Sequence, residues 1–122
     1  MSIPGYLSKE SELKAMGVEK VVVLSVNDAA VMTAWAKDQN VIGTIIKFIA
    51  DPRAEATMAL GLAISEPPTK FGYYPRTKRF AMIVVDGVVK KLNVCETATD
   101  STGDSIPEAS FVDQMLDDLR WI

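Results

Sequence analysis

A nearly unbroken run of β-branched residues at 20–26 limits the possible folds of this chain more than any other segment. Successive side chains of a strand point to opposite faces, so the run places apolar side chains on both faces. Burial on both faces is typical of a parallel strand whose sheet is covered by helices on each side. The run therefore predicts an α/β fold.

The segments on either side of this strand have helical spacing. Tyr6, Leu13 and Met16 stand seven and three residues apart and are followed by a glycine, which predicts a helix over 7–16. Apolar residues recur at i, i+1, i+4 and i+5 after the strand, which predicts a second helix over 29–38.

Asn27 and Asp28 directly precede the second helix, and short side chains with an oxygen acceptor are typical of N-caps. Met32 and Trp35 occupy its apolar positions. We expect these two side chains to lie in the core rather than to form a platform for a cofactor.

Two further β runs are separated by Asp86 and Gly87, and both residue types tolerate positive φ. This pair predicts a β-hairpin with a two-residue turn. The other predicted elements are a strand at 45–50, a helix opened by Asp51 and Pro52 that ends at Gly61, a loop at 65–75, strands at 79–85 and 88–94, and a polar loop at 97–104. Helices and strands alternate before the hairpin, so we expect an α/β mixed sheet with one antiparallel edge.

A final amphipathic helix is predicted after a capping box of Ser105 and Glu108. The residues expected on its buried face are Phe111, Val112, Met115, Leu116 and Leu119. The carboxylates expected on its solvent-exposed face are Asp113, Asp117 and Asp118.

Composition excludes several classes of function. The 122 residues are enough for one domain, which we expect to span 1–122. The sequence has no histidine, so Ser-His-Asp and Cys-His catalytic pairs are excluded and a structural zinc site lacks ligands. The seven glycines do not have the spacing of a phosphate-binding loop, and no cofactor is predicted. A net charge of −3 gives no reason to expect nucleic acid or an anionic membrane as a partner.

Several short segments between residues 3 and 94 resemble the type II peroxiredoxins, in the order in which that family has them. They are Ile3-Pro-Gly-Tyr6, Glu12-Leu-Lys-Ala-Met-Gly-Val18, Leu24-Ser-Val-Asn-Asp28, Val31-Met-Thr-Ala-Trp35, Phe48-Ile-Ala-Asp-Pro52, Leu60-Gly-Leu62, Arg76-Thr-Lys-Arg-Phe-Ala-Met82, Asp86-Gly-Val-Val-Lys90 and Leu92-Asn-Val94. The residues after Val94 resemble the family less, apart from the final helix.

The resemblance implies a thioredoxin-like fold and thiol-dependent reduction of hydrogen peroxide and alkyl hydroperoxides. In this family a peroxidatic cysteine attacks the peroxide as a thiolate and becomes a sulfenic acid, which a resolving thiol, thioredoxin or glutaredoxin then reduces. That cysteine lies in a Pro-x-x-x-Thr-x-x-Cys loop shortly before the Ile-Pro-Gly segment, and no such loop precedes Ile3 here. We therefore expect an incomplete, partial thioredoxin-like domain that lacks its nucleophile and its central N-terminal strand.

The missing central strand would lie between the strands at 21–26 and 80–85. Without it, backbone groups along that edge lose their partners, at about 1–3 kcal/mol for each buried group. Either these two strands pair directly, or another chain supplies the strand, or the 122 residues are an incomplete product. We expect an incomplete product, with aggregation through the open strand edges.

Arg79 matches the family arginine that stabilises the peroxidatic thiolate and orients the peroxide. Lowering the pKa of a thiol from about 8.5 requires an adjacent cation, and a guanidinium also offers several hydrogen-bond donors. The resemblance therefore implies an active-site position near the start of the first helix. The alternative is a surface arginine beside a strand, like Lys78.

Cys95 is the one cysteine of the sequence, which excludes an internal disulfide and indicates a reducing compartment. It could act as a resolving or substitute nucleophile, with Lys90, Lys91 or Arg79 lowering its pKa. The alternative is an incidental reduced cysteine, which the neighbouring Glu96 favours because a carboxylate raises the pKa of a nearby thiol.

The resemblance implies a peroxide substrate, thioredoxin or glutaredoxin as reductant, and a homodimer with Asn27 and Asp28 near its contact. Tyr73 and Tyr74 could form part of a dimer or substrate rim.

No signal peptide or span of about 18 apolar residues is present, and we expect a cytoplasmic location without a membrane partner. Three functions stay open: a peroxidase whose catalytic part lies outside this sequence, a non-catalytic scaffold that dimerises or binds other proteins, and a slow thiol peroxidase that uses Cys95.

Overall fold

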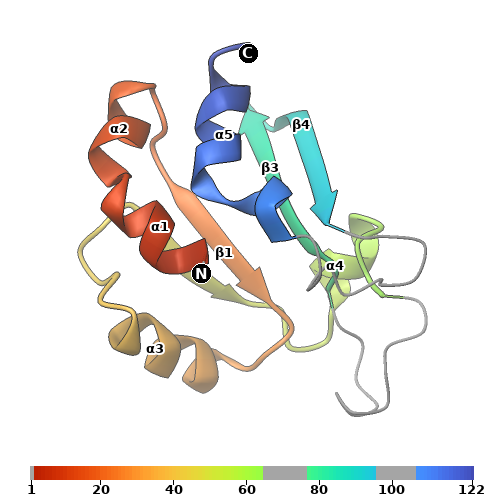
Figure 1. The fold of residues 1–122 in the computed structure, drawn as a ribbon. Coiled ribbons are helices and arrows are strands. Elements are labelled where there is room, and N and C mark those ends of the chain that lie inside the picture. The colour runs from red at the N-terminus through yellow and green to blue at the C-terminus, as the bar shows by residue number, and fades with distance from the viewer. Residues whose placement is uncertain (1, 65–76, 96–106) are drawn as a thin grey trace. The chain divides into compact units, whose positions relative to one another are not determined.

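The computed structural model describes residues 2–64, 77–95 and 107–122 (Figure 1). The chain divides into two compact units. We call residues 18–77 the central unit and residues 1–17 with 78–122 the terminal unit, and describe each by itself. Each unit has one two-stranded sheet among its described residues.

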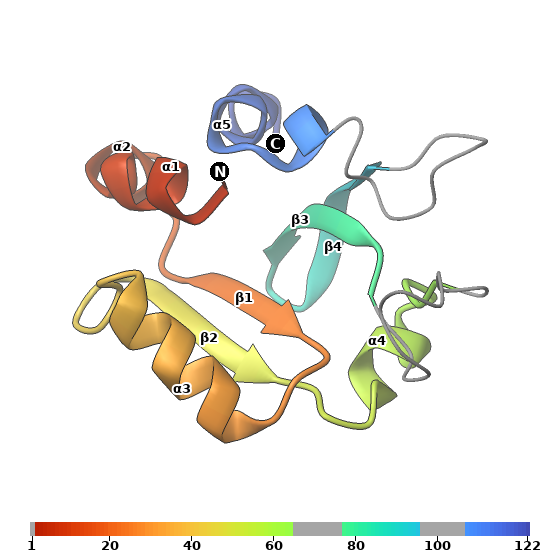
Figure 2. The same cartoon turned by 60° about the horizontal axis from the view of Figure 1, so that its bottom comes forward.

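The central unit is a β-α-β arrangement followed by a short helix. β1 (Val21–Ser25) and β2 (Ile46–Ala50) are parallel, with Val21 opposite Ile46 and Ser25 opposite Ala50. α3 (Ala29–Asp38) connects them and packs on β2 (Figure 2). α4 (Glu55–Ala59) follows β2.

The start of α3 confirms the prediction from sequence. Asp28 is the N-cap, and its carboxylate accepts a hydrogen bond from the Val31 backbone N–H over 2.8 Å. Asn27 donates its side-chain amide to Ser25 Oγ over 2.8 Å instead. One of the two cap candidates therefore caps the helix, and the other ties the strand end to the turn.

The core of the central unit lies between α3 and β2. Met32 and Ile46 are each 2% exposed, and the Trp35 and Phe48 rings meet edge-on with centroids 4.6 Å apart. The expectation that β1 is buried on both faces is wrong, because Val22 is 52% exposed. Among the described residues, β1 and β2 pair only with each other. The burial of β2 alternates along the strand, which shows that α3 covers one face of this sheet.

Asp51 does cap α4, but not from the position that the sequence predicts. Its carboxylate accepts hydrogen bonds from the Thr57 backbone N–H at 2.9 Å and the Thr57 hydroxyl at 2.7 Å. The helix begins only at Glu55, because Ala54 before it has a left-handed φ of 56°. Pro52 therefore lies in the preceding turn and not in the first helical turn.

The terminal unit is built on the predicted hairpin. β3 (Arg79–Val85) and β4 (Val88–Cys95) are antiparallel, with a register shift after Ile83. Asp86 and Gly87 have φ of 50° and 79°, as a type I′ turn requires at both central positions. The hairpin prediction is confirmed.

Helical segments from both ends of the sequence complete the terminal unit: α1 (Ser2–Ser8), α2 (Glu10–Ala15), the 3₁₀ helix η2 (Pro107–Ser110) and α5 (Val112–Leu119). η2 contacts both strands of the hairpin, and α1 contacts α5. The buried residues of α5 are Val112, Met115 and Leu116, on its predicted apolar face.

The prediction of one helix over 7–16 is wrong. Two short helices are present, separated at Lys9, whose ψ of 13° departs from helical geometry. The first helix begins before the predicted start at residue 7, and it includes Pro4. Proline is tolerated there because the backbone N–H groups of a first helical turn have no partner within the helix. The capping box is not the start of α5 either. Ser105 lies outside the described residues, and α5 begins after η2 with no side-chain cap at Phe111.

Some predictions lie outside the described residues. They are the loop at 65–75 with Tyr73 and Tyr74, and the polar loop at 97–104. The prediction of a single domain over 1–122 stays a prediction.

Candidate functional site

The two candidate site residues lie directly opposite each other. Arg79 opens β3 and Cys95 ends β4, and they are partners in the antiparallel register. Directly opposed residues of an antiparallel pair project from the same face. The side chains of Arg79 and Cys95 therefore project from neighbouring backbone positions on one face of the hairpin.

The Cys95 side chain is fully buried, with 0% exposure, and is not disulfide-bonded. Arg79 is half-buried, and its Nε atom is buried. Burial leaves the thiol without direct access to solvent. A nucleophilic role for Cys95 therefore requires a structural opening, whereas Arg79 keeps part of its side chain exposed.

Tyr6 of α1 lies near enough to Cys95 to interact with it electrostatically. Its hydroxyl donates a 2.7 Å hydrogen bond to the Ser110 carbonyl oxygen of η2. Burial, and to a smaller extent the electrostatic interaction with Cys95, raises the pKa of Tyr6 well above its usual value near 10. Cys95 is thus a neighbour of both Tyr6 and Arg79, which brings α1 and the start of β3 to one region of the terminal unit.

The Asn93 side chain of β4 also makes contacts in this region. Its side-chain amide lies 2.7 Å from Asp118 Oδ2, 3.1 Å from the Ala109 carbonyl oxygen and 3.3 Å from Met115 Sδ. Because Asn93 is two residues before Cys95, both side chains project from the same face of β4. The amide therefore connects the hairpin to η2 and α5.

Sequence reasoning missed Asn93 and the hydroxyl of Tyr6. In the sequence, the spacing of Tyr6 indicates only an apolar helix position, and Asn93 stands out only as part of a segment that resembles the family. The available signal was an amide inside a β run, where a buried position requires hydrogen-bond partners. Asp118, expected on the wet face of α5, is one of those partners.

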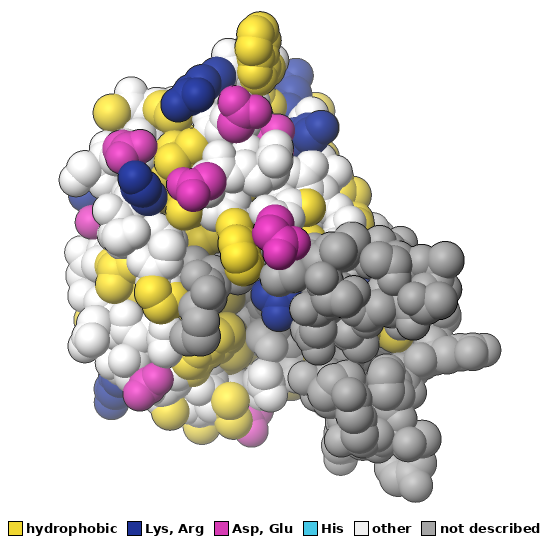
Figure 3. All heavy atoms as spheres, in the orientation of Figure 1, with side chains coloured by type: hydrophobic (Ala, Val, Ile, Leu, Met, Phe, Trp, Pro, Cys, Tyr) yellow, Lys and Arg dark blue, Asp and Glu magenta, His cyan; other side chains and the backbone are white. Residues whose placement is uncertain are grey.

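The other two carboxylates expected on the solvent side of α5 are at the surface. Asp113 and Asp117 are exposed, as predicted for α5. Figure 3 shows acidic groups over the stretch where Figure 1 places η2 and α5. Among the described residues there is no group of three or more potential metal-ligating side chains. No helix of the described part of the chain is long and apolar enough to cross a lipid bilayer.

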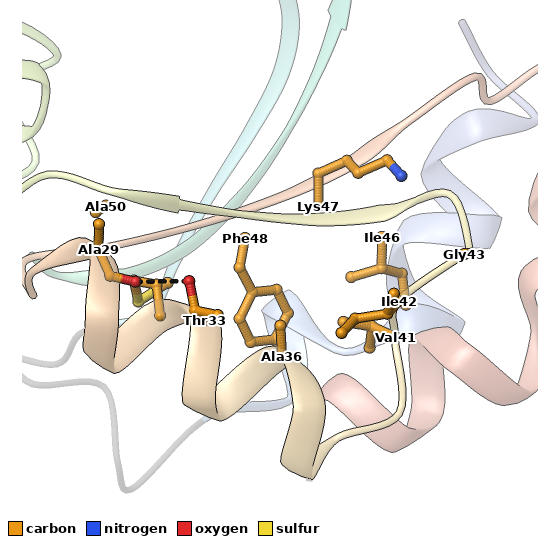
Figure 4. A pocket seen from close by; sticks show the side chains of 11 residues that line it. Ala29, Thr33, Ala36, Val41, Ile42, Gly43, Ile46, Lys47, Phe48 and Ala50 are labelled. Atoms are coloured by element: carbon orange, nitrogen blue, oxygen red, sulfur yellow. Dashed lines mark hydrogen bonds between the residues drawn. The ribbon is translucent and has the colours of Figure 1, made fainter.

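The central unit has an open cavity of about 350 Å³ between α3 and β2. Ala36, Val41, Ile46 and Phe48 give it apolar walls, whereas Lys47 lies on the opposite side of the strand (Figure 4). The Thr33 hydroxyl is bonded to the Ala29 carbonyl oxygen at 2.9 Å. This cavity therefore lacks the converging polar groups that orient a substrate.

Comparison with known proteins places both units of the chain in a family context. A family model described as Redoxin matches residues 1–115. The chloroplastic peroxiredoxin-2E-2 of Oryza sativa subsp. japonica is 36% identical over 100 residues, which cover 82% of this chain and 44% of that protein. The chloroplastic peroxiredoxin-2E of Arabidopsis thaliana is 38% identical over 94 residues, which cover 77% of this chain and 40% of that protein.

A solved structure shows the same similarity. Reduced Prx3 of Vibrio vulnificus in complex with hydrogen peroxide superposes with a TM-score of 0.79 at 39% identity. The match covers 98% of this chain and 66% of the Vibrio chain. The chain spans about half the length of the curated relatives that it matches.

Proposed function

Because the chain belongs to the redoxin family as a type II peroxiredoxin-like protein with a thioredoxin-like fold, we propose that it forms the arginine side of a peroxide-reducing site. The nucleophile of that site is a peroxidatic cysteine outside the 122 residues, which contain no Pro-x-x-x-Thr-x-x-Cys segment. Arg79 is the residue that stabilises the thiolate of this cysteine and orients the peroxide. The partly buried guanidinium at the start of β3 carries this proposal.

The chemistry requires a permanent cation at that position. The thiolate attacks one oxygen of the peroxide, the O–O bond breaks, and the cysteine becomes a sulfenic acid. The other oxygen leaves as water or an alcohol after taking a proton. A guanidinium lowers the pKa of the attacking thiol and donates hydrogen bonds to the polarised O–O group. A dithiol reductant such as thioredoxin or glutaredoxin then returns the sulfenic acid to the thiol and releases water.

The decisive test joins this chain to the missing part of the site. We would fuse the segment that precedes the matched region of Arabidopsis peroxiredoxin-2E, with its cysteine loop, before Ile3. The fusion should consume peroxide in the presence of thioredoxin, thioredoxin reductase and NADPH, and the 122-residue chain alone should not. A fusion that folds but shows no peroxide consumption contradicts the proposal.

Arg79→Gln in this fusion should lower the rate of peroxide consumption at least about tenfold, because one preorganised cationic donor is lost. It should also raise the pKa of the reactive thiol toward about 8.5, read from the pH dependence of its alkylation. Lys78→Gln is the matched control, since it removes the adjacent cation. Equal effects of the two substitutions would indicate that Arg79 has no special position.

A non-catalytic scaffold is the second candidate, favoured by the complete burial of Cys95. The chain would then act through dimerisation or protein interaction. The end of the hairpin offers exposed apolar side chains for this purpose: Val84, Val85, Val88, Val89 and Leu92. A folded dimer in sedimentation equilibrium, combined with an inactive fusion, would favour the scaffold.

Cys95 as a slow peroxidase is tested by Cys95→Ser in the 122-residue chain. Peroxide consumption that persists in this variant rules out that role. The cytoplasmic location likewise stays a prediction, since the two plant relatives carry chloroplastic names.

A further inference from the structure

The methionines of the described part of the chain differ widely in exposure. Met58 of α4 is 53% exposed, and Met16, directly after α2, is 36% exposed. Met32 and Met115 are only 2% and 4% exposed, and Met82 is half-buried. A peroxide must touch a thioether sulfur to oxidise it, so the rate of oxidation follows exposure. Met58 is therefore the most accessible thioether among the described residues.

The surroundings of Met58 also tolerate the oxidised side chain. Its backbone N–H donates to the Ala54 carbonyl oxygen at 2.9 Å, and its carbonyl oxygen accepts from the Gly61 N–H at 3.0 Å. Both bonds use backbone atoms, so an oxygen on the exposed sulfur leaves them intact. At Met115, in contrast, the side chain is buried and its sulfur lies 3.3 Å from the Asn93 amide. A sulfoxide there would disturb the packing of α5.

We propose that Met58 is a modification site, where peroxides oxidise the thioether to a sulfoxide in the folded protein and a methionine sulfoxide reductase reverses the change. The sulfur attacks one oxygen of the peroxide, and the O–O bond breaks. The sulfur loses two electrons and the peroxide gains them. The other oxygen takes the proton of the attacked hydroxyl group and leaves as water, or as an alcohol where the oxidant is an alkyl hydroperoxide.

This reaction uses no residue of the proposed peroxidase site, so the inference does not rest on that function. Two properties single out α4 for it. The sulfur is open to a small oxidant, and the helix keeps its hydrogen bonds when the sulfur becomes polar. The buried methionines lack both properties.

The test is peptide mapping of the 122-residue protein after treatment with hydrogen peroxide. Cleavage by trypsin after lysine and arginine puts Met58 in peptide 54–70, Met16 in 15–20, Met32 in 21–37 and Met115 in 92–120. Mass spectrometry of each peptide measures the gain of one oxygen, and fragment spectra show which side chain carries it. The same treatment in urea gives the rate for each methionine in the unfolded chain.

We expect Met58 to be oxidised at least about tenfold faster than Met32 and Met115 in the folded protein, because buried groups react only when the structure opens. Met16 should lie between them, and all four rates should become similar in urea. A Met58 rate no faster than that of the two buried methionines overturns the proposal.

Reversal and substitution provide the second measurement. Methionine sulfoxide reductases A and B, with dithiothreitol as reductant, should return most of the Met58 sulfoxide to the thioether in the folded protein. A sulfoxide that is reduced in the isolated peptide 54–70 but not in the folded protein overturns the proposal. Met58→Leu should abolish the gain of oxygen in this peptide, and a gain that persists overturns the proposal too. Met16→Leu is the matched control, and it should leave the Met58 rate unchanged.

Discussion

Arg79 and Cys95 are cross-strand partners at the end of the hairpin that is farthest from the Asp86-Gly87 turn. This register decides which cation neighbours the thiol. Lys91 is four residues from Cys95 along β4, a separation of about 13 Å at the rise of a strand. Of the three cations considered from the sequence, Arg79 is therefore the one positioned beside Cys95.

Burial of Cys95 predicts a difference between a polar and an apolar substitution. Cys95→Ser places a hydroxyl, which water solvates more strongly than a thiol, at a position with 0% exposure. It should lower the free energy of unfolding by about 1–3 kcal/mol. Cys95→Val keeps an apolar side chain and should cost less than about 1.5 kcal/mol. Urea denaturation followed by circular dichroism measures both, and a more stable Ser variant would contradict the burial.

The turn of the hairpin provides a prediction about backbone conformation alone. Gly87 has φ of 79°, and a Cβ at this position would meet no atom within 4 Å. Gly87→Ala should therefore destabilise the protein by about 1–2 kcal/mol through its left-handed conformation and not through a clash. Asp86→Asn is the control, because asparagine also tolerates positive φ, and its midpoint of urea denaturation should be nearly unchanged. Equal midpoints for the two variants would argue against the type I′ turn.

Local signals in the sequence predicted the parts of the fold that depend on neighbouring residues. Asp28 caps α3 and Asp86-Gly87 forms the turn because each acts within a few residues. Asp51 was identified as a cap, but the start of α4 was misplaced because Ala54 adopts a conformation that its residue type does not signal. The resemblance gave the family and the fold, which the comparisons confirm.

The surroundings of the candidate site were harder to predict because they depend on tertiary contacts. Alternation in β4 places Asn93 and Cys95 on one face but does not say what covers that face. η2, about 15 residues later in the sequence, contacts β4, and the Asn93 amide donates a hydrogen bond to the Ala109 carbonyl oxygen of η2. The alternation of β4 carries no signal for this tertiary contact.

Asp51 predicts how stability depends on pH. Hydrogen bonds from the Thr57 hydroxyl and from backbone N–H groups hold the pKa of this carboxyl below its usual value of 3.8. A carboxyl whose pKa is lower in the folded state stabilises the fold above its unfolded pKa, and this contribution is lost as pH falls through the folded pKa. Stability should therefore decrease below about pH 4. Asp51→Asn should lower stability at pH 7 and flatten this acid dependence in urea denaturation curves, whereas an unchanged pH profile would contradict the assignment.

The contact of α5 with the terminal unit can be tested by comparing its two faces. Leu116 is 6% exposed, and Leu116→Ala removes buried methyl groups and leaves a cavity. We expect a loss of about 2–5 kcal/mol in the free energy of unfolding. Asp117 is next in sequence but lies on the exposed face, where it pairs with Arg120 at 3.7 Å. Asp117→Ala should change stability by no more than about 1 kcal/mol, because exposed ion pairs contribute little. Similar losses in the two variants, measured by urea denaturation, would mean that α5 does not pack through its apolar face.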